Sequence, residues 1–245
     1  MSRRVRGGAQ HIPRPAGVRL GGPAPWAGLP PSERHLDVAR VRAALTTGPP
    51  ARPWPGEEMG LRTSAVLAAL YDDGGEAHVI LTRRAGHLRS HRGEVSFPGG
   101  RWEPGDGDLV TTALREASEE IGLDPASVDV FGELDHLMTL WSGASIVPYV
   151  GALPGPPEGL EPNPHEVERI LQVPLSELLS DEVYSEEVWT TPDRGTRRLW
   201  FFALHGDTVW GATAAMLRDL LARALGFEVE PPQTWGAQPP TGNVD

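Results

Sequence analysis

The chain has 245 residues, a formal charge of -11 at pH 7 and 39% hydrophobic residues. This length exceeds the usual ~100–150 residues of one domain but falls short of two, so one domain with extended ends is the simplest organisation. The acidic charge argues against nucleic-acid binding, which needs a basic surface. Cysteine is absent, which excludes disulfides and thiolate metal sites.

The sequence also lacks signals for membranes or export. No apolar run approaches the ~20 residues that span a bilayer, and the first residues lack the apolar core of a signal peptide. We therefore expect a cytoplasmic protein that acts on a small molecule, without a nucleic-acid or membrane partner. The oligomeric state stays open, with a homodimer as one option.

The two ends of the chain differ in composition from its middle. Residues 1–31 and 228–245 are rich in Pro, Gly and polar residues without periodicity, which predicts flexible tails. Between them, residues 32–227 form the predicted domain. It begins with a helix over residues 32–45, capped by Ser32, and continues through a Pro-rich linker over residues 46–58.

Strand-like segments dominate the next part of the chain. Residues 63–71 and 77–84 read as a hairpin around the turn at Asp72–Gly75, and residues 94–96 as a short strand. Further strands are predicted within residues 128–140 and 146–153, and over residues 197–202 and 208–210. A short helix over residues 175–179 and a last helix that begins at Gly211 complete the predicted elements.

A helix over residues 110–121 carries an unusual group of acids. At about 100° per residue, Glu116, Glu119 and Glu120 share one face, and Gly122 is placed to end the helix. Carboxylates at this spacing repel each other, so clustering them brings no structural gain unless a cation lies between them. Oxygen ligands suit Mg²⁺ or Mn²⁺. The alternative is a solvated acidic face on which Arg115 and Glu119 pair.

The segment before this helix favours the metal site. Residues 97–100 read Phe-Pro-Gly-Gly, a bend in which the backbone can approach an ion or a phosphate closely. The carbonyl of Gly99 or Gly100 is therefore a further candidate ligand.

With this bend and helix the chain resembles the Nudix hydrolases. Their box is Gly-x5-Glu-x7-Arg-Glu-U-x-Glu-Glu-x-Gly-U, where U is a bulky aliphatic residue, and its second half matches residues 115–123 with Ala117 at the first U. The early acid matches only if one residue is inserted, which leaves Asp106, Asp108 and Glu103 as candidates. The resemblance implies an α/β/α sandwich with a mixed β-sheet between helices.

The resemblance also assigns roles in the box. Glu116, Glu119 and Glu120 are expected to hold the metal with help from Gly100, and Arg115 to orient a carboxylate. Glu116, Glu120 or Glu166 is expected to act as the base. Glu166 lies in a later loop, where many Nudix enzymes supply a further acid, and Glu161, Glu168 and His165 compete with it.

The segment upstream of the bend narrows the resemblance. Residues 80–85 (ILTRRA), Arg89, Gly93 and the Phe-Pro-Gly-Gly bend are similar to the signature of coenzyme A pyrophosphatases in the Nudix superfamily. Arginine donates two hydrogen bonds to a phosphate at once, and histidine can assist. The predicted substrate-binding residues are therefore Arg83, Arg84, Arg89 and His91, although any one of these arginines could instead neutralise the protein's own acids.

The reaction that this group implies is hydrolysis of coenzyme A and its thioesters to 3′,5′-ADP and 4′-phosphopantetheine or its acyl form. Two alternatives remain. One is a broader Nudix hydrolase of nucleoside diphosphate derivatives such as ADP-ribose or NADH. The other is a catalytically silent nucleotide-binding module, which the retained Glu116, Glu119 and Glu120 argue against.

Overall fold

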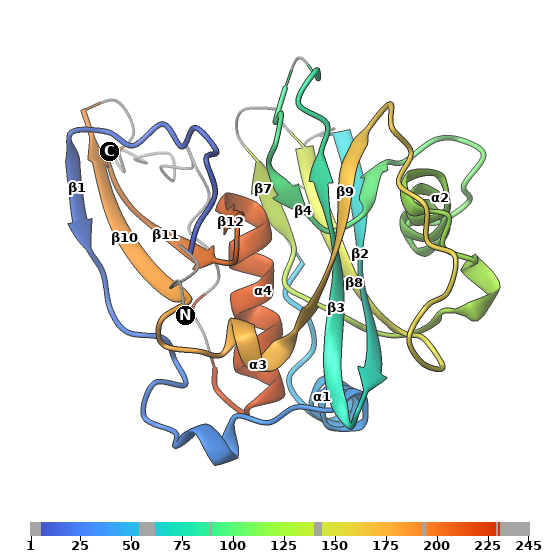
Figure 1. Ribbon diagram of the computed structural model, residues 1–245, viewed down its shortest axis with the longest axis horizontal. Helices are drawn as coiled ribbons and strands as arrows, with labels where there is room; N and C mark the ends of the chain where they lie inside the picture. The colour runs from blue at the N-terminus through green and yellow to red at the C-terminus, as the bar shows by residue number, and fades with distance from the viewer. Residues whose placement is uncertain are drawn as a thin grey trace, which may run out of the picture.

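Figure 1 shows a computed structural model of the chain, which describes residues 6–53, 62–88, 90–139, 144–192, 195–228 and 230. Within these residues the strands form two sheets. The central sheet contains the segments predicted to surround the acidic helix. Its strands are β2 (Arg62–Asp73), β3 (Glu76–Arg84), β4 (Val95–Ser96), β5 (Gly99–Arg101), β6 (Asp129–Glu133), β7 (Leu137–Thr139), β8 (Ala144–Ala152) and β9 (Val167–Pro174).

The central sheet is mixed, as expected. Strands β2 and β8 are parallel, whereas the other pairings in this sheet are antiparallel. The hairpin predicted from the Asp72–Gly75 turn is present, since β2 and β3 pair in register from Leu70 opposite Val79 to Asp73 opposite Glu76. The predicted strand over residues 128–140 is divided into β6 and β7.

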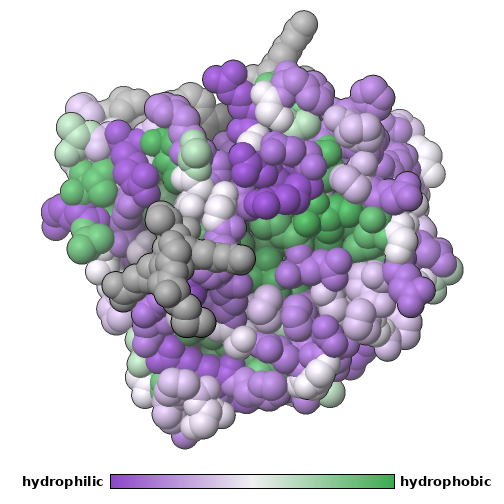
Figure 2. All heavy atoms as spheres, viewed as in Figure 1, coloured by the Kyte–Doolittle hydropathy of each residue, from purple (hydrophilic) through white to green (hydrophobic). Residues whose placement is uncertain are grey.

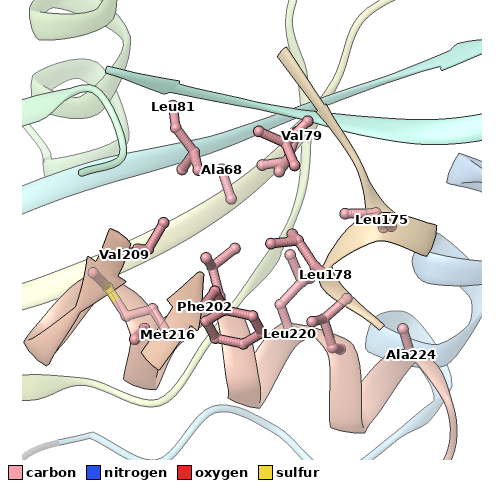
Figure 3. Packing of buried hydrophobic residues seen from close by; sticks show 14 of the residues in the cluster. Ala68, Val79, Leu81, Leu175, Leu178, Phe202, Val209, Met216, Leu220 and Ala224 are labelled. Carbon is pink, nitrogen blue, oxygen red and sulfur yellow. The ribbon is translucent and has the colours of Figure 1, made fainter. Parts of the chain in front are cut away.

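Helices cover both faces of this sheet. Helix α2 (Leu109–Ile121) packs on one face through a cluster that includes Ala113, Ala117 and Ile121. Helix α4 (Gly211–Ala224) lies between the central sheet and the second sheet (Figure 1). Figure 3 shows this second core, in which Met216 and Leu220 face Phe202 and the side chains of β2 and β3. The sequence-based expectation of a sheet between helices is therefore confirmed.

The second sheet was not anticipated as a separate layer. Its order is β1-β10-β11-β12, formed by β1 (Gly17–Leu20), β10 (Tyr184–Thr191), β11 (Gly195–Ala203) and β12 (Thr208–Trp210). All of its pairings are antiparallel. The predicted closing strands thus belong to a layer beyond α4, beside the N-terminal segment.

The prediction of a flexible tail over residues 1–31 is wrong for its described part. Strand β1 pairs with β10, and Trp26 is fully buried with its indole N–H donated to the Leu179 carbonyl at 3.1 Å. Gln10 exchanges hydrogen bonds with the backbone of Thr208. Non-local pairing supplies the order that composition does not reveal. The C-terminal tail, predicted over residues 228–245, lies outside the described residues except for Glu228 and Glu230.

The predicted first helix is also corrected. A short 3-10 helix η1 (Pro31–Glu33) stands where the helix was expected to begin, and α1 (Val38–Thr47) starts only after Asp37. The Asp37 carboxylate accepts a hydrogen bond from the Arg40 amide at 2.7 Å, so Asp37 and not Ser32 is the N-cap. Leu36, which lies off the helical stripe, is buried in the α4 core.

The remaining short elements are η3 (Pro125–Ser127) and α3 (Leu175–Leu178). No described helix is long and apolar enough to cross a membrane. The surface in Figure 2 is largely hydrophilic around an apolar area near its centre. Among the described residues, the large hydrophobic side chains that remain exposed are Leu20 and Trp102.

Candidate active site

The glycine bend is built so tightly that side chains are excluded. Strand β5 pairs with β2, with Gly99 opposite Val66 and Gly100 opposite Ala65. Gly99 has φ 155°, and a Cβ there would lie 2.4 Å from the Ala65 carbonyl oxygen. A Cβ on Gly100 would lie 2.4 Å from the Glu116 carboxyl group. The two glycines therefore let α2 place a carboxylate directly against the backbone of β5.

Helix α2 ends at the predicted glycine, and its start is capped by a residue that the sequence analysis had listed only as a candidate acid of the box. Asp108 caps the helix by accepting a hydrogen bond from the Thr111 amide at 2.7 Å. Gly122 ends it in the left-handed region at φ 69°. Because the apolar stripe packs on β2, the turn that holds Glu116 and Glu120 is held against the glycine bend, whereas Glu119 is turned toward solvent.

Arg115 gathers the acids at the start of this site. Its guanidinium contacts Asp106 at 2.7 Å, Glu119 at 3.0 Å and Glu116 at 3.1 Å. The hydrogen bond from Arg115 holds the pKa of Asp106 well below its ordinary value. Of the candidates for the early acid, Asp106 is thus the one that anchors Arg115, while Asp108 is the helix cap.

Glu120 is the most deeply placed carboxylate of the site. Its side chain is 4% exposed, and its nearest polar neighbours are the Gly99 amide at 3.3 Å and the Arg84 guanidinium at 3.8 Å. Burial raises the pKa of Glu120 to about 7, and the charges of Glu166 and Glu116 act in the same direction. Burial also raises the pKa of Glu116. The simple alternative of a solvated acidic face holds for Glu119 alone.

The side chains of this site have the ligand atoms that a hard divalent cation prefers. It consists of carboxylate oxygens crowded beside a bend without side chains, and its buried members are costly to ionise without a counter-charge. Within the described residues, however, no group of three or more acids and histidines is close enough to enclose a metal ion. Arg115 holds oxygens of Glu116 and Glu119 instead. Binding of a cation by all three glutamates would therefore require these arginine contacts to rearrange.

The predicted basic residues do not all meet at this site. Arg84, at the end of β3, reaches Glu120. Its neighbour Arg83 turns elsewhere and pairs with Asp207 at 2.9 Å. His91 is exposed and contacts Glu94 at 2.9 Å, which raises the pKa of His91. Arg89 lies outside the described residues.

Glu166 lies next to β9, which begins at Val167. Its backbone carbonyl accepts a hydrogen bond from Ala85 at 2.8 Å, and its exposed side chain is close enough to raise the pKa values of Glu116 and Glu120. Of its sequence competitors, Glu168 faces Arg83 at 3.5 Å. The loop of Glu166 is joined to α2 through its backbone, since the Glu166 amide donates to the Asn163 carbonyl and the Asn163 amide donates to the Glu120 carbonyl at 2.8 Å.

One buried acid near the site was missed from the sequence. Asp207 is 0% exposed and lies between Arg83 and Arg169. In the sequence it follows Gly206 just before a short strand, where an aspartate reads as an ordinary turn residue. No local pattern could have identified it, because its partners are 124 and 38 positions away.

The chain is similar in sequence to a known domain family and to named relatives. Residues 61–194 match the model of the NUDIX domain. The chain is 41% identical over 143 residues to a protein of Photorhabdus laumondii named "Uncharacterized Nudix hydrolase NudL", which covers 58% of this chain and 74% of that protein. For the protein of the same name in Citrobacter koseri, the identity is 34% over 183 residues, or 72% of this chain and 88% of the relative.

The solved structures that are similar to the chain are more distant in sequence. One is the NUDIX domain of Shewanella oneidensis NrtR in complex with ADP ribose, with 16% identity, a TM-score of 0.41, and coverage of 59% of this chain and 87% of that one. Another is a C. elegans Ap4A hydrolase, with 19% identity, a TM-score of 0.39, and coverage of 45% of this chain and 78% of that one.

Proposed function

Because the chain belongs to the Nudix hydrolase family, we propose that it cleaves the diphosphate bond of coenzyme A and its thioesters. The products would be 3′,5′-ADP and 4′-phosphopantetheine or its acyl form. The observation that carries this proposal is the meeting of the upstream signature with the box, since Arg84 from the signature lies 3.8 Å from Glu120 of the box.

Arg84 has binding capacity that the protein itself does not use. Its Nε is buried and, within the described residues, has no hydrogen-bond partner. A buried donor without a partner costs free energy, which a phosphate oxygen of the substrate would recover. We therefore assign Arg84 to the substrate phosphates, with Arg89 and His91 as further predicted contacts. Arg83 is left out of this assignment because Asp207 occupies its guanidinium.

The carboxylates of α2 are proposed to hold Mg²⁺ or Mn²⁺, with Glu116, Glu119, Glu120 and the Gly100 carbonyl as ligands. A divalent ion there supplies Lewis acidity toward phosphate oxygens and water, as is general for metal-dependent phosphate chemistry. As the contacts of Arg115 to Glu116 and Glu119 rearrange, its ion pair with Asp106 at 2.7 Å would keep the guanidinium beside these carboxylates to orient them. The proton acceptor is Glu116, Glu120 or Glu166, of which Glu166 lies outside α2 and is exposed.

The test is a comparison of substrates with identified products. The purified chain is supplied with Mg²⁺ or Mn²⁺ and with coenzyme A, dephospho-coenzyme A or ADP-ribose, and the products are separated by chromatography. We expect coenzyme A to be cleaved fastest and to give 3′,5′-ADP. Equal rates on all three substrates would exclude a dedicated site for the 3′-phosphate and favour a broader nucleoside diphosphate hydrolase. Metal-dependent turnover of none of them would contradict the proposal.

A matched pair of variants connects this activity to the signature. Arg84→Met removes the charge beside Glu120, whereas Arg19→Met removes an exposed charge on β1, in the second sheet. We expect the KM for coenzyme A to rise by about tenfold or more in Arg84→Met, the scale of a lost charged hydrogen bond. An unchanged KM in Arg84→Met would remove Arg84 from the proposed phosphate site.

A further inference from the structure

The second sheet contacts the central sheet through an ionic group whose acid is buried, close to the candidate active site. Asp207 precedes β12, and its carboxylate lies between Arg83 of β3 and Arg169 of β9. Arg83 and Arg169 are direct partners in the register of these two strands. Like charges directly opposite each other in a sheet are destabilising. The fully buried Asp207 carboxylate supplies the counter-charge that allows this pair.

The pair coincides with an irregularity in the strand register. Arg83 lies opposite Arg169, but the next residue, Arg84, lies opposite Val167, so that Glu168 is the extra residue on β9. Such bulges redirect the side chains that follow them. Here the residues beyond the bulge are Arg84, which reaches Glu120, and Glu166, whose amide donates to the Asn163 carbonyl at 3.0 Å while the Asn163 amide donates to the Glu120 carbonyl at 2.8 Å.

We propose that Asp207 is a positioning residue for the candidate active site. By binding Arg83 and Arg169 together, it holds the ends of β3 and β9 at the spacing that places Arg84 beside Glu120 and the loop of Glu166 beside α2. The second sheet therefore acts on the site through this carboxylate. The catalytic part of this inference rests on the proposed function, whereas the structural part does not.

The anchor of Asp207 is itself well supported. Its neighbour Thr208 exchanges backbone hydrogen bonds with Gln10 at 2.8 and 3.1 Å, and the Gly8 amide donates to the Thr208 hydroxyl at 3.1 Å. Strand β12 pairs with β11, with Phe201 opposite Trp210. The N-terminal segment and the second sheet thus keep the Asp207 carboxylate in place while it binds the two arginines.

The test compares Asp207→Asn with Asp219→Asn. Asp219 is a second buried aspartate, on α4, which pairs with Arg223 and not with β3 or β9. Hydrogen exchange of the full chain without metal or substrate is read by mass spectrometry on peptides covering residues 83–88 and 166–170. We expect Asp207→Asn to speed exchange there roughly tenfold, as local opening predicts, and Asp219→Asn to leave these peptides unchanged.

The second measurement is kcat/KM, taken at a temperature well below the melting temperatures of the Asp207 and Asp219 variants. We expect kcat/KM for coenzyme A to fall about tenfold or more in Asp207→Asn, since small displacements of positioned groups are costly. Asp219→Asn should stay close to the wild type. If Asp207→Asn does not fold, Arg169→Gln breaks the same contact from its half-exposed partner, with the same peptides expected to exchange faster.

The outcomes separate the two proposals. Equal exchange in the Asp207 and Asp219 variants would overturn the positioning role, whatever the substrate is. Faster exchange in Asp207→Asn together with a wild type inactive on coenzyme A would support the positioning of these strand ends and contradict only the proposed function. Faster exchange with unchanged kcat/KM in an active enzyme would show that the site does not depend on Asp207.

Discussion

Two groups of buried acids, one on α2 and one around α4, differ in the hydrogen bonds and ion pairs that they make. Around α4, Asp219 accepts hydrogen bonds from Arg223 at 2.9 Å and from the Asp135 amide at 3.0 Å, and Asp135 is bound by Arg52. On α2, the contacts that Glu120 makes within the described residues are the Gly99 amide at 3.3 Å and Arg84 at 3.8 Å.

Burial raises the pKa of both Asp219 and Glu120, so the pKa alone does not distinguish the two groups. Their hydrogen bonds do. An acid whose two carboxylate oxygens each accept a hydrogen bond from an arginine or a backbone amide contributes to the fold, because losing it leaves those buried donors without a partner. A buried acid whose contacts are long lacks a close positive charge that would compensate its own. The comparison indicates that Glu120 is kept for a ligand and Asp219 for the structure.

The largest expected effect comes from removing the charge of Glu120. In Glu120→Gln we expect kcat/KM for coenzyme A to fall by about a thousandfold, which corresponds to roughly 4 kcal/mol of transition-state stabilisation. The melting temperature should be unchanged or higher, because a neutral amide costs less to bury. Steady-state kinetics and thermal unfolding test this together. Retained activity would contradict the assignment of Glu120 to a ligand and of Asp219 to the structure.

The next effect is a dependence of stability on pH. Because the pKa of Glu120 is about 7 in the folded state and 4.5 ordinarily, the folded state binds more protons between these values. The free energy of unfolding should therefore fall as pH rises from about 4.5 to 7, by up to ~3 kcal/mol from this group. Urea unfolding at pH 5 and pH 7.5 without divalent ions measures it. The control is Glu120→Gln, in which this part of the dependence should vanish.

Asp219→Asn should show the opposite of Glu120→Gln, a loss of stability without a loss of activity. We expect about 2 kcal/mol less stability at neutral pH, since the substitution weakens a buried charge pair with Arg223. The kcat/KM should stay near the wild-type value below the melting temperature. Urea unfolding and kinetics on one preparation check both expectations. A large loss of activity here would mean that the group around α4 also serves the reaction.

The smallest expected effect separates the two glycines of the bend. A Cβ on Gly100 meets the movable Glu116 carboxyl, whereas a Cβ on Gly99 meets the backbone of Ala65. We expect Gly100→Ala to lower kcat/KM about tenfold with little change in stability, because it displaces a side chain that positions charge. Gly99→Ala should instead lower the melting temperature. Similar losses of stability in both variants would contradict this assignment.

Local patterns in the sequence were sufficient for the elements that surround the site. Helix α2 with its end at Gly122, the glycine bend and the β2–β3 hairpin follow from helical periodicity, from turn residues and from an apolar run. The same patterns misjudged residues 6–31. That segment has little periodicity of its own, and its order comes from pairing with β10 and β12, more than 150 positions away.

The sequence by itself determined which acids share a helix face and that a bend without side chains precedes them, since both depend on neighbouring residues. Only the tertiary structure decided that Glu120 is buried while Glu119 is exposed, and that Arg84 faces the site while Arg83 turns to Asp207. These outcomes depend on which surfaces pack together. Burial and charge pairing are properties of residues far apart in the chain, so no local pattern contains them.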